Sequence, residues 1–373
     1  MAGVLVKVPD LLRAWPWQRH LGEHYDEVKA QSVEWFVGFG AFDAKSQDAF
    51  DRCEFDTPLA KLAMLSYRFG DLARCRTGAD LIMLFYAFDE YTNVADEVVT
   101  RELADMVMDG LRNPDKPRPA DECLLGEMAR QFWSTGREYS SAMAERHLLE
   151  TMQLYVDAVV QQSADWATDR LRTIDDYLAV RRHTSGCLPS FALAEMELDV
   201  PEDVYRHPLL ERMRDCGAYL IIASNDLYSY PVERARGHAL HNLVTTVMYQ
   251  LDLAPQAAVD WIGNWSDGIA AEFLECRANL PSWGPEIDEQ IHRYVDGIAS
   301  WVRGADDWSF ESQRYFGVAG EEVRRTREIY MLPRVERDGA GSAALREGVV
   351  DAERLAVAAM QIRRDLALGT SPE

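Results

Sequence analysis

The chain has 373 residues, of which 47% are hydrophobic, so a large core can be buried and a wholly disordered chain is excluded. Its 62 acidic residues outnumber its 39 basic residues, and the net charge of -23 argues against nucleic acid as a partner, because phosphate binding needs clustered Lys and Arg. The same excess means that an anionic substrate would need local Arg side chains or metal cations to hold it.

Apolar residues recur at helical spacing along almost the whole chain. Positions i, i+3, i+4 and i+7 are apolar in the clearest helical segments, which are residues 24–39, 57–69, 145–166 and 286–302. Strand-like alternation is confined to VLVKV at residues 4–8. Breaks rich in Pro and Gly separate the helical segments at residues 111–122, 198–208 and 279–286. We expect roughly ten to twelve helices in one all-α domain over residues 1–334, followed by a partly helical, flexible extension over residues 335–373.

The cysteine pattern and the N-terminus indicate a reducing compartment. No C-x-x-C pair occurs among the six cysteines, which lie at positions 53, 75, 123, 187, 216 and 276. The opening MAGVLVKVPD lacks the apolar core of a signal peptide, and no apolar run reaches transmembrane length. We therefore expect a cytoplasmic protein with reduced thiols and no membrane partner.

An apolar run, LIMLFYAF at residues 81–88, leads directly into Asp89 and Glu90. Every helical face of this run is apolar, so Asp89 should end a buried helix, where an unpaired carboxylate is costly. If the helix continues, Asp89, Asn93 and Asp96 share one face at spacings i, i+4 and i+7. Such a face is typical either of a solvated helix end or of a ligand set for a hard cation such as Mg²⁺.

A second polar stretch, NDLYSYPVE, occupies residues 225–233. Asn225, Ser229 and Glu233 are four residues apart each time, so their side chains point to one side of a helix. An amide oxygen, a hydroxyl and a carboxylate would then form a three-point oxygen site. A capping or solvated polar face is the alternative interpretation, and the apolar CGAYLIIAS just before the stretch weakens it.

These two stretches resemble the metal-binding motifs of class I terpene synthases. DEYTN at residues 89–93 is similar to the motif D-D/E-x-x-D of that family, and NDLYSYPVE is similar to N-D-x-x-S-x-x-x-E. The combination FDEYTN, RRHTSG, NDLYSY and RYF resembles fungal sesquiterpene cyclases in particular. The resemblance implies a single all-α bundle around a central active-site cavity. It also implies three Mg²⁺ ions, with ligands at Asp89, Asn225, Ser229 and Glu233.

The stretch RRHTSGCLPSF at residues 181–191 predicts a broken helix, because Pro189 offers no N–H to the carbonyl of Ser185. In the family, a break of this kind faces the cavity. The resemblance implies that Arg182 senses diphosphate, that Ser185 is a linker and that Gly186 is a small effector residue. Arg181 is the competing choice for the sensing arginine.

Further residues follow from the same resemblance. Arg314 and Tyr315 match a late R-Y pair that hydrogen-bonds diphosphate when the site closes, and Arg234 matches a basic residue that follows the second motif. Aromatic side chains are expected to line the cavity or, alternatively, to be ordinary core packing; they are Phe85, Tyr86, Phe88 and Trp308.

Two residues depart from the family pattern. Asn93 replaces the last Asp of the first motif, which lowers the local negative charge. Pro231 lies inside the second motif and is expected to kink the helix near Tyr230, which would shift Glu233 relative to Asn225.

The resemblance implies a Mg²⁺-dependent sesquiterpene synthase, monomeric or homodimeric, that ionises farnesyl diphosphate and cyclises the carbocation. One alternative is a chain-elongating prenyl transferase, which normally carries two aspartate-rich motifs and is therefore disfavoured by the second motif here. The other alternative is a catalytically silent helical binding protein of the same fold, supported only by Asn93 and Pro231.

Overall fold

The computed structural model describes residues 4–40, 59–93, 95–236 and 239–331. Cys53 and the extension predicted for residues 335–373 lie outside these ranges. The five described cysteines are all free thiols. Among the described helices, none combines the length and the apolar character needed to cross a membrane.

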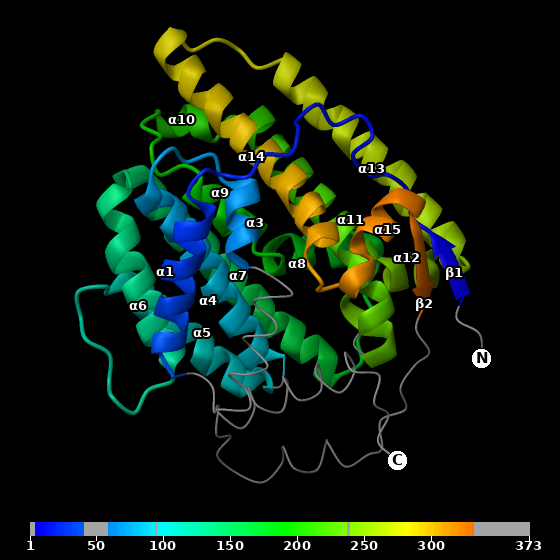
Figure 1. The fold of residues 1–373 in the computed structure, drawn as a ribbon, viewed down its shortest axis with the longest axis horizontal. Coiled ribbons are helices and arrows are strands. Elements are labelled where there is room, and N and C mark those ends of the chain that lie inside the picture. The colour runs from blue at the N-terminus through cyan, green and yellow to red at the C-terminus, as the bar shows by residue number, and fades with distance from the viewer. Residues whose placement is uncertain (1–3, 41–58, 94, 237–238, 332–373) are drawn as a thin grey trace.

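Helices make up most of the described chain, which confirms the all-α prediction (Figure 1). The α-helices are α1 (Tyr25–Gly38), α3 (Leu59–Ser66), α4 (Leu72–Thr92), α5 (Glu97–Arg112), α6 (Leu124–Gly136), α7 (Ala142–Ala167), α8 (Ile174–Thr184), α9 (Cys187–Leu193), α10 (Glu202–Tyr205), α11 (Pro208–Arg236), α12 (Leu243–Leu251), α13 (Pro255–Ala278), α14 (Pro285–Glu311) and α15 (Gly320–Thr326). Short 3₁₀ turns lie at Arg137–Tyr139, Ala239–His241 and Gly317–Ala319. The number of α-helices in these ranges exceeds the expected number because α9, α10 and α15 span only seven, four and seven residues.

Short polar side chains fix where several helices begin. Each accepts a hydrogen bond from a backbone N–H of the first turn, and these N-caps are Asp71, Asp96, Ser141, Thr173 and Asn242. A cap of this kind is worth about 1 kcal/mol, because it satisfies a donor that the helix itself leaves unpaired. The predicted breaks at residues 111–122 and 279–286 are confirmed, since each separates two helices.

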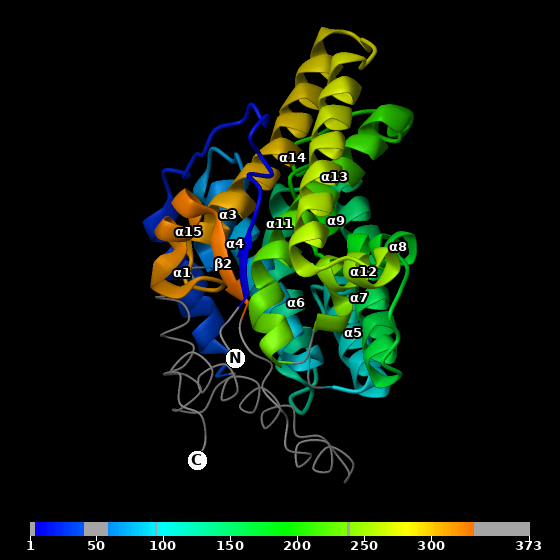
Figure 2. The ribbon, with the colours of Figure 1, turned by 90° about the vertical axis from the view of Figure 1, so that its right-hand side faces the viewer.

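The long helices surround the short helix α9. Helix α11 packs against α13 and α14, α14 packs on α3, and α3 packs on α4. On the other side, α7 packs against α5, α8 and α9. Helix α9 also contacts α4, α8 and α11, so it contacts both of the helices that carry the two motifs (Figures 1 and 2). The connection between α13 and α14 protrudes at one end of the molecule in both views.

A two-stranded sheet joins the two ends of the described chain. Strand β1 (Val4–Lys7) pairs antiparallel with β2 (Glu328–Met331), with Lys7 opposite Glu328. The sequence predicted β1 but not β2, because the four residues EIYM carry no alternating pattern long enough to recognise. Strand β2 follows α15 directly. Its pairing with β1 therefore attaches the region after α14 to the N-terminal strand.

Candidate active site

Asp89 lies in the last turn of α4 and is half-buried. The helix ends at Thr92, and Asn93 caps it through a backbone bond of 2.9 Å to the carbonyl of Asp89. Asp96 instead starts α5, where its side chain accepts from Val99 N at 2.9 Å. The expectation that Asp89, Asn93 and Asp96 share one helical face is therefore wrong for Asp96, because an Asp before a helix serves as an N-cap.

Tyr155 of α7 connects the first motif with α8. Burial raises the pKa of the Tyr155 phenol, the negative charge of Asp89 raises that pKa further, and the positive charge of Arg181 opposes both. Tyr155 therefore lies near both charges. Its ring also contacts Phe85 and Phe88 of α4, with centroid distances of 4.9 and 5.7 Å.

The remaining predicted aromatic residues have different neighbours. Tyr86 contacts Phe36 of α1 at a centroid distance of 6.4 Å, on a different side of α4 from the Phe85–Tyr155 contact. Trp308 of α14 is buried and meets the ring of Tyr315 edge-on at 6.0 Å.

The predicted break after RRHTSG is confirmed. Helix α8 ends at Thr184, Gly186 adopts the left-handed conformation with φ of 71°, and α9 begins at Cys187. Pro189 falls in the first turn of α9, where no backbone N–H is needed. A Cβ on Gly186 would lie 3.2 Å from the ring of Phe85, so this glycine lets the break approach α4 closely.

The two arginines before the break bind different parts of α11. Arg181 Nη2 donates to Asn225 Oδ1 at 2.7 Å and to Asp226 Oδ1 at 3.0 Å. Arg182 Nη1 donates to Asp215 Oδ1 at 2.8 Å, ten residues earlier on α11, which is about 15 Å along the helix. Arg181 is thus the arginine that contacts the second motif in this structure.

Helix α11 continues from Pro208 to Arg236, so Pro231 does not end it. Within the second motif, Asn225 Nδ2 donates to the hydroxyl of Tyr315 at 2.7 Å. The Ser229 side chain is buried and interacts with the carboxyl of Glu233. Glu233 Oε2 accepts from Asn242 Nδ2 at 2.9 Å. Burial, followed by the negative charge of Asp226, raises the pKa of Glu233 to about 7.

Asp226 anchors the motif to its surroundings. Its carboxylate is buried and accepts from the hydroxyl of Tyr177, from Arg181 and from the backbone N of Leu243, the last at 2.9 Å. Motif spacing did not predict the roles of Tyr177, Asp226 and Asn242. A usable signal existed only for Asn242, because an Asn before the apolar run LVTTVMYQL is typical of a helix N-cap.

The predicted late R-Y pair follows α14. The helix ends at Glu311, and Tyr315 reaches α11 through its bond to Asn225. The Arg314 guanidinium lies 5.9 Å from the centroid of the Tyr315 ring. Arg234, at the far end of the second motif, is exposed.

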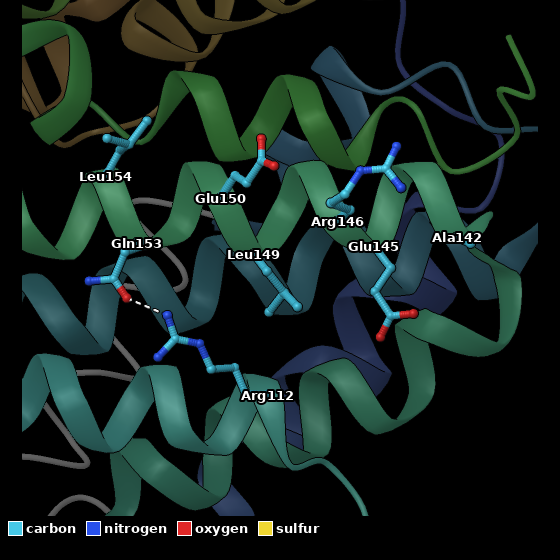
Figure 3. Close-up of a pocket in the computed structure, with 8 residues that line it drawn as sticks. All are labelled: Arg112, Ala142, Glu145, Arg146, Leu149, Glu150, Gln153 and Leu154. Atoms are coloured by element: carbon cyan, nitrogen blue, oxygen red, sulfur yellow. Dashed lines mark hydrogen bonds between the residues drawn. The ribbon is translucent and has the colours of Figure 1, made fainter. Parts of the chain in front are cut away.

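A separate pocket lies on the surface of α7 (Figure 3). Its volume is about 720 Å³, and it is bordered by charged and apolar side chains, including Glu145, Leu149 and Leu154. Arg112 of α5 points towards α7 and donates to Gln153 at 2.6 Å. None of the predicted site residues borders this pocket, so it is not the candidate active site.

Known proteins match both the motifs and the fold. Residues 80–268 match the family model described as terpene synthase family 2, C-terminal metal binding. A Delta(6)-protoilludene synthase of Stereum hirsutum is 41% identical over 346 residues, which are 92% of this chain and 93% of the relative. This chain belongs to the terpene synthase family. Sesquiterpene synthase Agr9 of Cyclocybe aegerita is 44% identical over 328 residues, or 87% of each chain.

Solved terpene synthases share the fold of this terpene synthase. A linalool/nerolidol synthase from Streptomyces clavuligerus, in complex with 2-fluorogeranyl diphosphate, superposes with a TM-score of 0.69 at 22% identity, covering 79% of this chain and 97% of that chain. Hedycaryol synthase in complex with nerolidol gives a TM-score of 0.66 at 19% identity, covering 81% of this chain and 99% of that chain. The family resemblance inferred from DEYTN and NDLYSYPVE is thus confirmed.

The second motif of this terpene synthase has the chemistry of a divalent metal site. Asn225, Ser229 and Glu233 offer only oxygen donors, which Mg²⁺ prefers. The Ser229 side chain is buried and interacts with the Glu233 carboxyl, so the hydroxyl and the carboxylate already lie together, as two ligands of one cation must. A nearby cation would also relieve the repulsion between Glu233 and Asp226 that helps to raise the pKa of Glu233. The residues present therefore fit a divalent cation.

Proposed function

We propose that this protein is a Mg²⁺-dependent sesquiterpene synthase that ionises farnesyl diphosphate and cyclises the resulting carbocation. The observation that carries the proposal is the cluster on α11, where the oxygen ligands Asn225, Ser229 and Glu233 lie beside Arg181 and Tyr315. The relatives named as sesquiterpene synthases, which match most of the chain at 41–44% identity, support it.

Asp89, Asn225, Ser229 and Glu233 are the proposed ligands for three Mg²⁺ ions. Bound Mg²⁺ would offset the negative charge of the diphosphate and make it a better leaving group. The ligands come from the end of α4 and from α11, and Tyr155 and Arg181 lie between these two groups. This arrangement resolves the charge problem of an acidic protein that takes an anionic substrate.

Arg182 and Arg314 are the proposed donors to the diphosphate, with Tyr315 and Arg234 beside them. The Arg182 side chain is about one-third exposed and held by a single ion pair to Asp215, and its Nε has no hydrogen-bond partner among the described residues. Such an arginine can leave its carboxylate partner at little cost when a diphosphate arrives. Arg181, in contrast, is held by Asn225 and by the buried Asp226, which suits a residue that positions the motif.

We propose that the active-site cavity lies next to the metal ligands and excludes water, because water would quench a carbocation. Phe85, Phe88 and Trp308 would present aromatic faces to the migrating positive charge, with Tyr86 behind them. Ser185 and Gly186 lie at the break beside Phe85, where the resemblance assigns a linker and an effector. The described free cysteines fit the proposed cytoplasmic location, and we propose a monomer or a homodimer.

The test is incubation of the purified protein with farnesyl diphosphate and Mg²⁺, followed by gas chromatography and mass spectrometry of the extract. We expect a cyclic sesquiterpene, specifically Delta(6)-protoilludene, because several relatives at 41–43% identity carry that name. Parallel reactions with geranyl and geranylgeranyl diphosphate define the chain length. A second set of reactions contains isopentenyl diphosphate as the five-carbon co-substrate, and a longer prenyl diphosphate there would instead identify a prenyl transferase. No product from any of these reactions would identify a silent binding protein.

A further inference from the structure

Pro231 interrupts the hydrogen bonding of α11 inside the second motif. Proline has no backbone N–H, so the carbonyl of Leu227 lacks its usual partner one turn later, and the proline ring crowds that carbonyl. Glu233 lies two residues beyond this weak point, whereas Asn225 lies six residues before it. A ligand set that spans such a point needs support from another part of the chain.

The side chain of Asn242 supplies that support. Its Nδ2 donates to the backbone carbonyl of Asp226 and to Glu233 Oε2, both at 2.9 Å. Its Oδ1 accepts from Val244 N at 2.9 Å. These three partners fix the orientation of the amide. In the reverse orientation, Oδ1 would face two acceptor oxygens and Nδ2 would face the N–H of Val244. Asn242 is fully buried, so no water competes for these bonds.

We propose that Asn242 is a positioning residue that bridges α11 across Pro231 and holds the Glu233 carboxylate for metal binding. One hydrogen bond lies on the N-terminal side of Pro231, at Asp226, and the other lies on the C-terminal side, at Glu233. Restraining one carboxylate oxygen limits rotation of the whole group, as outer-shell hydrogen bonds do at metal sites. The inference rests on the proposed function, in which Glu233 is a metal ligand.

Capping of α12 does not by itself account for the choice of asparagine at this position. Capping uses only the Oδ1 of Asn242, and Ser serves about as well as Asn at an N-cap. The two N–H donors are what asparagine adds. A second hydrogen bond, from Leu243 N to Asp226 Oδ2 at 2.9 Å, also holds α12 on α11. This bond does not involve the Asn242 side chain. Capping and positioning can therefore be separated by mutation.

The experiment compares Asn242→Ser with Asn242→Ala in the full-length protein. Serine keeps a capping oxygen but is too short to reach both acceptors, whereas alanine loses the cap as well. Ser141→Ala is the matched control, because Ser141 caps α7 by accepting from Ala144 N at 3.1 Å and contacts no proposed ligand. Each protein is titrated with Mg²⁺ in the presence of inorganic diphosphate. The readouts are the melting temperature without ligand and the Mg²⁺ concentration that gives half of the ligand-induced thermal shift.

Both Asn242 variants should need at least about tenfold more Mg²⁺ to reach half of the thermal shift. This is the typical effect of losing a residue that hydrogen-bonds to a metal ligand. Asn242→Ala should melt below Asn242→Ser, and Ser141→Ala should melt below wild type with an unchanged Mg²⁺ midpoint. An unchanged midpoint in Asn242→Ser, with a responsive wild type, would overturn this inference alone. A wild type whose melting does not respond to Mg²⁺ and diphosphate would overturn the proposed function together with it.

Discussion

Nη2 of Arg181 lies 2.7 Å from Oδ1 of Asn225, an oxygen that the motif assigns to a metal ion. Arg182, the next residue, turns away and binds Asp215. Sequence spacing treats the two arginines as competitors for one role. Their contacts separate them, because the first is fixed in the ligand cluster and the second is held by a partly exposed ion pair.

The two arginines should therefore respond differently to mutation. Arg182→Ala should lower kcat/KM about a hundredfold or more, because a charge-assisted contact with diphosphate contributes about 3 kcal/mol. Its melting temperature should fall less than that of Arg181→Ala, since Asp215 is partly exposed and also lies near Arg212 and Arg214. Arg181→Ala should lower both turnover and melting temperature, because it leaves the buried Asp226 without its cationic partner. A stable but inactive Arg181→Ala beside a fully active Arg182→Ala would reverse this assignment.

The metal assignment predicts loss of turnover without loss of fold. Asp89→Ala and Asn225→Ala should both abolish product formation, measured by gas chromatography, while the helical circular dichroism stays intact. Asp96→Ala is the matched control from the same acidic stretch. It removes only an N-cap and should cost about 1 kcal/mol of stability with turnover retained. If either ligand variant kept most of its activity, that residue would not hold the metal.

The Mg²⁺ requirement should depend on pH through Glu233, whose pKa is raised by burial and by Asp226 to about 7. Metal binding needs the ionised carboxylate, so the Mg²⁺ midpoint should rise about tenfold for each pH unit below 7 and level off above about pH 8. Titration of the Mg²⁺- and diphosphate-induced thermal shift at several pH values measures this. The Glu233→Gln variant should lose the dependence, and an identical dependence in that variant would assign it to another group.

The same carboxyl makes an opposite prediction for the metal-free protein. Folding raises the pKa of Glu233 above its ordinary value of 4.5, so the protonated carboxyl stabilises the fold at acid pH. This contribution should be lost as the pH rises through about 7, where the buried group ionises. Without metal, the stability difference between wild type and Glu233→Gln should therefore shift against wild type as the pH rises from about 4.5 to about 7, and it should stay level above that range. A pH-independent difference in melting temperature would contradict the raised pKa.

The last turn of α14 and the residues that follow it should close over bound ligand. Tyr315 already contacts Asn225, and Trp308 packs on its ring, so residues 308–316 are positioned beside the ligand cluster. Mg²⁺ plus diphosphate should protect this segment from hydrogen exchange, with neither component sufficient alone. Tyr315→Phe should release more acyclic or hydroxylated product, because a looser closure admits water. Unchanged exchange in the presence of both ligands would rule out closure.

Local signals in the sequence predicted most of the helical framework. Helices α7 and α14 follow from long amphipathic repeats, and the break at Gly186 follows from the chemistry of Pro189. Helical spacing alone puts Asp96 on the same face as Asp89, because spacing does not show where a helix ends. Its role as a cap depends on the turn at Asn93, which the pattern alone does not reveal.

Tertiary contacts explain what sequence spacing could not supply. The bonds from Asn242 to Asp226 and Glu233 join separate helices, and no helical period relates them. The division of roles between Arg181 and Arg182 likewise depends on which acidic side chain of α11 each can reach. The motifs identified the type of chemistry, whereas the partners that orient each ligand became visible only in the folded chain.

The pairing of β1 with β2 has a consequence for biosynthesis. Lys7 lies opposite Glu328, a separation of 321 residues along the chain. During synthesis β1 leaves the ribosome before the described helices and β2 leaves it after them, so this long-range contact forms late. The segment with Arg314 and Tyr315 lies just before β2 and gains its second anchor at that moment. A nascent chain can thus assemble the helical bundle first, and it acquires a tethered closing segment only once β2 has been synthesised.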